Sequence, residues 1–223
     1  MKLIVANTKM YLNTMEEVEK FQREMDIYKN YFIVAPQNIY LENFVRNGFS
    51  VAAQNVSNKE SGAHTGETSP KSLKDLKVEY VMIGHAEIRK KYKIENFYIQ
   101  EKIKKSLNNN LKVILCIGEK LKKKNEVYTI IEKQLENIKP NENLIISYEP
   151  VWAIGGSNIL GTKELIKIIN FIKEKGHKKV LYGGSITEEN INRLNEIENI
   201  DGFLVGSRSV DTKKFKKIIE VVK

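Results

Sequence analysis

Four polar side chains that could take part in proton transfer stand where apolar runs of the chain end. Glu149 closes the run "NLIISYE", and His85 follows "VMIG". Asn7 ends the first run, and Lys9 comes two residues later, on the same side of an extended segment. Each of them alone is explained as well by a surface role, such as a glutamate paired with a lysine. Together, a carboxylate, an imidazole, an ammonium group and an amide suit acid–base chemistry.

Two further apolar runs end in small residues. The motif "YGGS" places Gly183, Gly184 and Ser185 after one run, and "VGSRS" places Gly206 and Ser207 after another. Glycine allows the backbone to approach a ligand closely, because it has no Cβ. Ordinary turn chemistry explains any one of these pairs. These small residues follow apolar runs just as the polar candidates do, and this shared placement indicates a site more strongly than any single residue.

The elements that must position these side chains follow from the hydrophobic pattern. Eight apolar, β-branched runs recur, and we expect each to be a strand: residues 3–7, 31–36, 49–55, 78–84, 112–118, 143–149, 179–184 and 202–206. Most intervals between them hold charged stretches with helical spacing, including residues 15–28, 95–107, 127–138 and 163–175, and residues 213–222 close the chain. Strands that alternate with helices predict a parallel sheet.

Eight such units in 223 residues predict a closed (β/α)₈ barrel with trimmed helices and loops, in a single domain spanning residues 1–223. Typical barrels of this kind have about 250 residues. A doubly wound open sheet is the alternative, but it usually has fewer strands, and the first turn here lacks a GxGxxG pattern. In a barrel, the residues at the carboxyl ends of the strands share one rim, so the polar residues above should meet there.

Composition limits the classes of protein that remain. The formal charge is +9, but the lysines are scattered over expected helix surfaces without interleaved aromatic residues, so we expect no nucleic-acid partner. A single cysteine, Cys116, excludes an intrachain disulfide framework and favours a reducing, cytoplasmic location. The first residues do not read as a signal peptide, and no run is long enough to predict a membrane span.

Six motifs along the whole chain resemble those of the triosephosphate isomerase family, in the family's order. They are "AQN…GAHTGETSP", "IGHAEIRK", "ILCIGE", "YEPVWAIG", "LYGGS" and "DGFLVGS". The resemblance implies an isomerase that interconverts dihydroxyacetone phosphate and D-glyceraldehyde 3-phosphate in glycolysis and gluconeogenesis, without a cofactor or metal. No His/Cys/Asp cluster in the sequence has the spacing of metal ligands.

The resemblance also assigns roles to single residues. Glu149 corresponds to the catalytic base that moves a proton through an enediolate. His85 corresponds to the electrophile; it opens the expected short helix "AEIRKK", whose N-terminus disfavours an imidazolium. Lys9 and Asn7 correspond to substrate-binding and catalytic groups beside the reacting oxygen. Glu87 corresponds to a supporting carboxylate near that lysine.

Phosphate binding falls to small residues in three loops. Gly155, Ser185, Gly206 and Ser207 correspond to the family's phosphate cradle, where convergent N–H groups suit a dianion. Residues 150–160 correspond to a lid that closes over the site and excludes water. Several positions depart from the family pattern, including Thr8, Ile88, Ile94 and the lid tip, and two of them bear directly on the site. Ala86 replaces the usual serine, and Ser207 replaces the usual glycine, which requires an ordinary φ there.

Residues 54–70 form the longest interval without helical spacing, and a loop of this length is usually functional or disordered. In the family this loop inserts into a second subunit, so the resemblance implies a homodimer with Thr65 and Glu67 in the dimer loop.

Two other hypotheses stay open at this level. One is a different phosphate-binding barrel enzyme. The other is a barrel that binds phosphate ligands without catalysis, which the substitutions at Ala86, at Ser207 and in the lid would favour.

Overall fold

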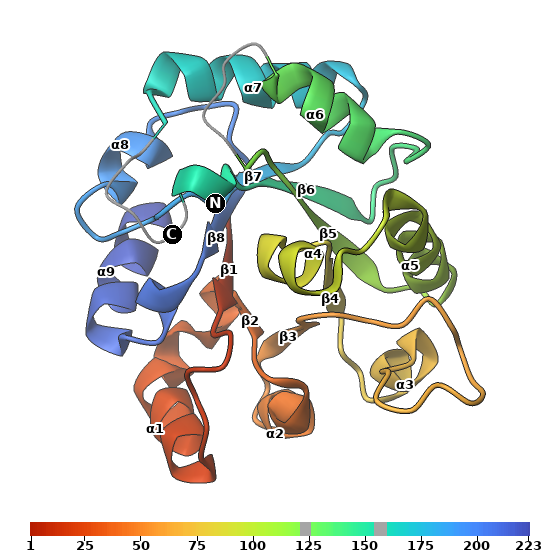
Figure 1. The fold of residues 1–223 in the computed structure, drawn as a ribbon. Coiled ribbons are helices and arrows are strands. Elements are labelled where there is room, and N and C mark those ends of the chain that lie inside the picture. The colour runs from red at the N-terminus through yellow and green to blue at the C-terminus, as the bar shows by residue number, and fades with distance from the viewer. Residues whose placement is uncertain (121–125, 154–159) are drawn as a thin grey trace.

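The computed structural model describes residues 1–120, 126–153 and 160–223. Its sheet is a closed barrel of eight parallel strands in sequence order (Figure 1). The strands are β1 (Leu3–Asn7), β2 (Ile33–Ala35), β3 (Ser50–Ala53), β4 (Tyr80–Ile83), β5 (Lys112–Ile117), β6 (Leu144–Tyr148), β7 (Val180–Tyr182) and β8 (Gly202–Val205). The predicted (β/α)₈ barrel is therefore confirmed. The open-sheet alternative is wrong, because β1 pairs with β8 from Leu3↔Gly202 to Ala6↔Val205.

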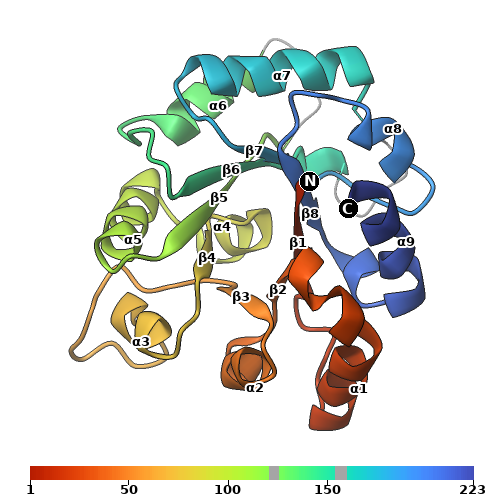
Figure 2. The same ribbon diagram turned by 180° about the vertical axis from the view of Figure 1, so that it is seen from behind.

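Helices surround the barrel, as Figures 1 and 2 show from its two ends. In the described residues they are α1 (Met15–Met25), α2 (Leu41–Arg46), α3 (Pro70–Asp75), α4 (Ala86–Tyr92), α5 (Asn96–Asn108), α6 (Val127–Leu135), α7 (Thr162–Glu174), α8 (Ile191–Asn195) and α9 (Thr212–Val222). Short 3₁₀ helices add η1 (Asp26–Tyr31), η2 (Asn38–Tyr40), η3 (Val151–Ala153) and η4 (Ser207–Ser209). None of the helices in these ranges has both the length and the apolar character needed to cross a membrane.

The strands are buried on both faces, which explains their almost continuous apolar sequences. Side chains alternate between two cores. Ile4, Ala6 and their counterparts pack outward against the helices. Val5, Ile145, Leu204 and other alternate residues fill the barrel interior.

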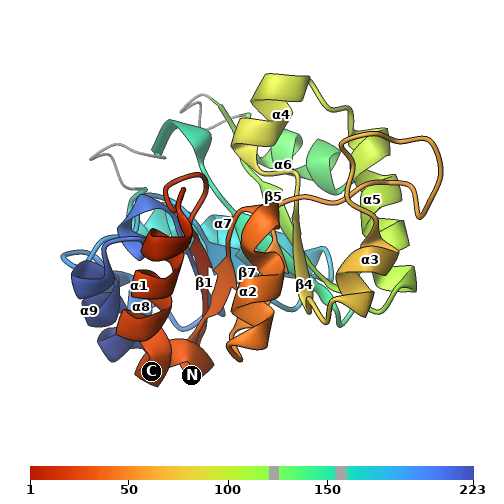
Figure 3. The same ribbon diagram turned by 90° about the horizontal axis from the view of Figure 1, so that it is seen from below.

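The barrel has two distinct ends. Figure 3 shows both chain termini at one end and α4 at the other. The loop between β3 and α3 projects from the side of the molecule near α3 and α5 (Figures 1 and 3). It contains no helix or strand, as predicted for residues 54–70, and its tip, residues 61–67, is exposed.

Candidate active site

The side-chain alternation of the strands brings polar residues to the carboxyl end of the barrel interior. Val5, Ile145 and Leu204 fill the interior, and the next inward positions on their strands lead to Asn7 and, beyond the strand ends, to Glu149 and Gly206. The same strand geometry that forms the apolar core therefore ends in a polar layer.

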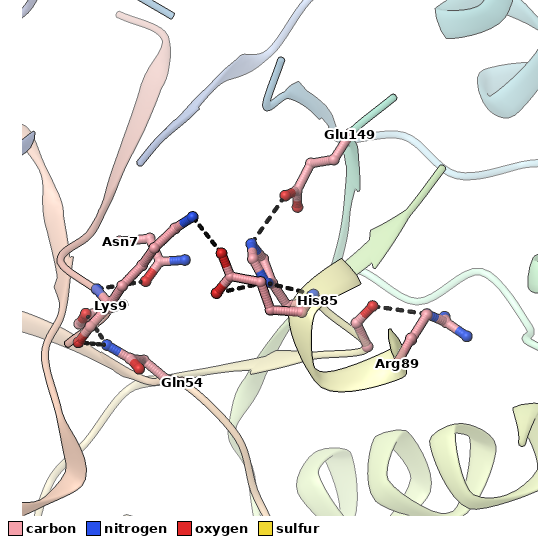
Figure 4. Close-up of polar contacts among 9 residues, drawn as sticks. Asn7, Lys9, Gln54, His85, Arg89 and Glu149 are labelled. Atoms are coloured by element: carbon pink, nitrogen blue, oxygen red, sulfur yellow. Dashed lines mark hydrogen bonds and ion pairs between the residues drawn. The ribbon is translucent and has the colours of Figure 1, made fainter. Parts of the chain in front are cut away.

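Glu149 and His85 are in contact within this layer. The Glu149 side chain is only 3% exposed, and its Oε2 lies 3.3 Å from Nε2 of His85 (Figure 4). Its other oxygen, Oε1, accepts a hydrogen bond of 3.2 Å from the hydroxyl of Ser147, two residues earlier on β6. The carboxylate is thus held between two donors, with little contact with water.

His85 caps the N-terminus of α4. Its Nδ1 accepts the backbone N–H of Glu87 at 3.4 Å, so a neutral ring carries its proton on Nε2, facing Glu149. Burial lowers the pKa of the ring, but the hydrogen bond and charge of Glu149 raise it by more, and the pKa lies above its ordinary value. The expected position of the ring at a helix N-terminus is present, and Glu149 and Glu87 both favour the protonated ring.

Gly183 makes room for the Glu149 side chain. A Cβ added at position 183 would lie 2.5 Å from Cγ of Glu149 and 3.3 Å from Oγ of Ser147. The backbone of residue 183 does not have the positive φ that only glycine adopts easily. Glycine is therefore needed at position 183 to leave room for the Glu149 side chain, and not to allow a special backbone conformation.

Lys9 is held in a strained turn that directs its ammonium group toward α4 (Figure 4). Its φ is 49°, and Oδ1 of the buried Asn7 accepts its backbone N–H at 3.1 Å. Gln54 donates to its carbonyl at 2.9 Å. Nζ of Lys9 lies 2.6 Å from Oε1 of Glu87. Burial raises the pKa of Glu87, but the hydrogen bond and charge of Lys9 lower it by more, leaving the pKa below its ordinary value.

One cavity of about 440 Å³ joins these groups to the loops after β7 and β8. Among the described residues, its lining includes Lys9, His85, Glu149, Gly183, Ser185, Gly206, Ser207 and Arg208. Asn7 lines an adjoining cavity of about 250 Å³, which shares Lys9 and His85 with the first. The structure therefore brings the four polar candidates to one rim, with Asn7 beside the main cavity.

The small residues after β7 and β8 also line this cavity. Ser185 has a φ of 41°, and its hydroxyl donates to the carbonyl of Ala153, which ties the loop after β7 to η3. Ser207 begins η4 and has no positive φ, so a residue with a Cβ fits where the family pattern has glycine. Gly155, the fourth predicted member of the cradle, lies outside the described residues, as do residues 154–159 of the expected lid.

Sequence reasoning missed a buried hydrogen-bonded cluster beside the site. Glu119, just after β5, accepts the indole N–H of Trp152 at 2.6 Å and the hydroxyl of Tyr148 at 3.1 Å. Burial raises the pKa of Glu119, although these donors pull it down. The cluster fixes η3, the segment that leads from Glu149 into residues 154–159. No local pattern indicates it, because its members come from separate elements.

The other titratable candidates take structural positions. Cys116 is buried as expected, and burial, followed by the charge of Glu149, raises the pKa of its thiol, which disfavours a thiolate. Thr65 and Glu67 lie on the exposed loop tip and line neither of the two cavities. Over the described ranges, no group of three or more His, Cys, Asp or Glu side chains is placed to hold a metal ion.

Comparisons with known proteins agree with this geometry. The family model for triosephosphate isomerase matches residues 2–222. A triosephosphate isomerase from Thermodesulfovibrio yellowstonii is 38% identical over 98% of both chains. Another from Buchnera aphidicola is 36% identical over 98% of this chain and 97% of its own. A third, from Ureaplasma parvum, is 35% identical over the full length of both.

Proposed function

Since the chain belongs to the triosephosphate isomerase family, we propose that it performs the family's reaction with Glu149 as the base. The protein is an aldose–ketose isomerase that interconverts dihydroxyacetone phosphate and D-glyceraldehyde 3-phosphate, a step of glycolysis and gluconeogenesis. The observation that supports the role of Glu149 is its buried carboxylate, 3.3 Å from Nε2 of His85 on the wall of a cavity that also contains Lys9.

The proposed reaction moves one proton between adjacent carbons. The Glu149 carboxylate removes a proton from C1 of dihydroxyacetone phosphate, and the C–H electron pair forms a C1=C2 double bond. The C2 carbonyl electrons move to its oxygen, which yields an enediolate. The protonated Glu149 then delivers a proton to C2, the proton of the C1 hydroxyl passes to the oxygen on C2, and the C1 aldehyde and the C2 hydroxyl form. A base shielded from water suits this step, since water cannot compete for the proton.

We assign the stabilisation of the enediolate oxygens to His85 and Lys9. The neutral His85 ring has its proton on Nε2, from which it donates toward a substrate oxygen. A substrate that enters between His85 and Glu149 separates the ring from the carboxylate, so the upward pull on its pKa weakens. Lys9 supplies a positive charge, Glu87 holds its ammonium group, and Asn7 holds its backbone.

The phosphate group is proposed to bind at the loops after β7 and β8, to the backbone N–H groups of Ser185, Gly206 and Ser207. Gly155 joins this set by its position in the family motif. Backbone N–H groups that converge from separate loops suit a phosphate dianion, because they supply several donors without adding a full charge.

Turnover in a coupled assay, run in both directions, tests the proposal. We expect Glu149→Ala to lower kcat by at least about 10³-fold, since it removes the base. Inorganic phosphate should still inhibit, or bind to, the wild type and the variant alike. Glu16→Ala, which truncates an exposed glutamate on α1, serves as the control. Near wild-type activity of Glu149→Ala would exclude the role of Glu149. Phosphate binding without wild-type turnover would instead favour a non-catalytic barrel.

We also propose that the protein is a homodimer joined through residues 54–70. The exposed tip of this loop, with Thr65 and Glu67, supports the proposal. Exposed apolar side chains nearby add to it: Phe97 and Tyr98, which share a surface hollow with Glu67, are 60% and 49% exposed. Sedimentation at working concentration should show a dimer, and a monomer alone would contradict this. The single cysteine supports a cytoplasmic location.

A further inference from the structure

Arg208 is a basic residue at the phosphate side of the main cavity that the roles described above do not include. It lies in η4, directly after Ser207, and lines the same cavity as Ser185 and Lys9. Its side chain is 38% exposed, so a small anion can reach it from solvent.

Within the part of the chain that the structure describes, the donors of this guanidinium make no hydrogen bond. Nε of Arg208 lies 3.9 Å from Oε2 of Glu188, which is too long for a hydrogen bond. That oxygen is buried and has no hydrogen-bond partner in the described part of the chain. The Glu188 side chain is 11% exposed. Over the described residues, no acceptor lies within hydrogen-bond distance of the guanidinium, so its planar fork of N–H donors can bind a second anion.

The charges around the cavity indicate that a bound phosphate needs a further positive group. Lys9 also lines the cavity, but its ammonium group is already paired with Glu87, with Nζ 2.6 Å from Oε1. A phosphate dianion beside η4 would meet neutral backbone donors and the nearby negative charge of Glu188. Arg208 lines the cavity and Glu188 does not, and guanidinium forks bind phosphate oxygens in a bidentate manner.

We propose that Arg208 binds the substrate phosphate directly and is a specificity-determining residue of this isomerase. The inference rests on the proposed function, because it takes the substrate to be a triose phosphate. A structural ion pair between Arg208 and the largely buried Glu188 is the alternative, and such a pair would leave the Ki for inorganic phosphate unchanged on substitution of Arg208.

The first test compares Arg208→Ala with a matched control, Arg23→Ala. Arg23 is also exposed and also loosely paired, 3.8 Å from Glu19 on α1, away from the cavity lining. For Arg208→Ala we expect the KM for D-glyceraldehyde 3-phosphate and the Ki for inorganic phosphate each to rise roughly tenfold. The kcat and the melting temperature should change little. Arg23→Ala should leave all four values near those of the wild type.

A phosphate-free substrate separates phosphate binding from a general defect. Turnover of D-glyceraldehyde, followed by proton NMR, should be the same in the wild type and Arg208→Ala. Equal losses with both substrates, or an unchanged Ki for inorganic phosphate, would overturn the proposal. Absence of wild-type turnover with the triose phosphates would contradict the proposed function instead.

A second background excludes an indirect effect through Glu188. Removing Arg208 alone exposes the phosphate to the carboxylate of Glu188, which would weaken binding by repulsion. In the Glu188→Gln background that repulsion is absent, and Arg208→Ala should still raise the Ki for inorganic phosphate by roughly the same factor. If the effect of Arg208→Ala disappears in this background, Arg208 only neutralises Glu188, and direct binding is refuted.

Discussion

Substituting Gly183 with alanine should displace the proposed base without altering the backbone. The added Cβ would lie 2.5 Å from Cγ and 3.1 Å from Cδ of Glu149, whereas carbon atoms in contact prefer about 3.5–4.0 Å. Glu149 must therefore move by about 1 Å, away from its position against His85. A displacement of this size at a reacting group lowers kcat by about 100-fold. Crowding in a packed site should also destabilise the fold by about 1–3 kcal/mol.

The measurements are kcat and KM in the coupled assay, inhibition by inorganic phosphate, and urea unfolding. The Ki for phosphate should stay near the wild-type value, because position 183 displaces Glu149 and not the loop carrying Ser207. Gly161→Ala is the control, since a Cβ at the start of α7 meets no atom of residues 1–120, 126–153 or 160–223 within 4 Å. A kcat for Gly183→Ala within threefold of wild type would refute the idea that this glycine positions the base.

Three further predictions concern the groups around the base. Ser147→Ala removes the 3.2 Å hydrogen bond to Glu149 and should lower kcat roughly fivefold; an unchanged kcat would show that His85 alone positions the carboxylate. Trp152→Phe deprives buried Glu119 of its 2.6 Å donor and should cost about 2 kcal/mol in urea unfolding, and an unchanged midpoint would argue against the cluster. His85 should titrate by NMR with a pKa above 6.5, and Glu149→Gln should lower that pKa. Since the folded-state pKa is raised, His85 protonation stabilises the fold fully below about pH 6.5, and this stabilisation is lost as pH rises through the folded pKa; a ring that titrates below 6.5 would contradict this.

The strands were predictable from the sequence because their signal is local. The run at residues 143–149 became β6, Leu144–Tyr148, and the run at residues 112–118 became β5, Lys112–Ile117. Helix ends were less accurate. The stretch predicted over residues 15–28 divides into α1 and the 3₁₀ helix η1 after Met25, because the last turns tighten as the chain approaches β2. Helices α2, α3 and α8 have five or six residues, too few to display a helical period.

Part of the candidate site was also predictable from local sequence, and part was not. Strand ends identify Asn7, His85 and Glu149, and the contact with Ser147 follows from its place two residues before Glu149 on one strand face. The role of Gly183 as space for Glu149 does not follow from the sequence. It depends on a distance between two strands, which no local pattern contains.

By itself, the sequence determined the order of strands and helices, the polar residues at the strand ends and the family of the protein. Each of these depends on residues within a few positions of one another, or on motifs that remain recognisable in isolation. The tertiary structure decided which groups touch. Pairing of β5 with β6 sets Trp152 against Glu119. The barrel, closed by the pairing of Leu3 with Gly202, sets Lys9 beside Glu87 and brings Arg208 to the cavity that Glu149 also lines. Contacts between distant residues arise from the packing of the whole chain, so they become visible only in the folded molecule.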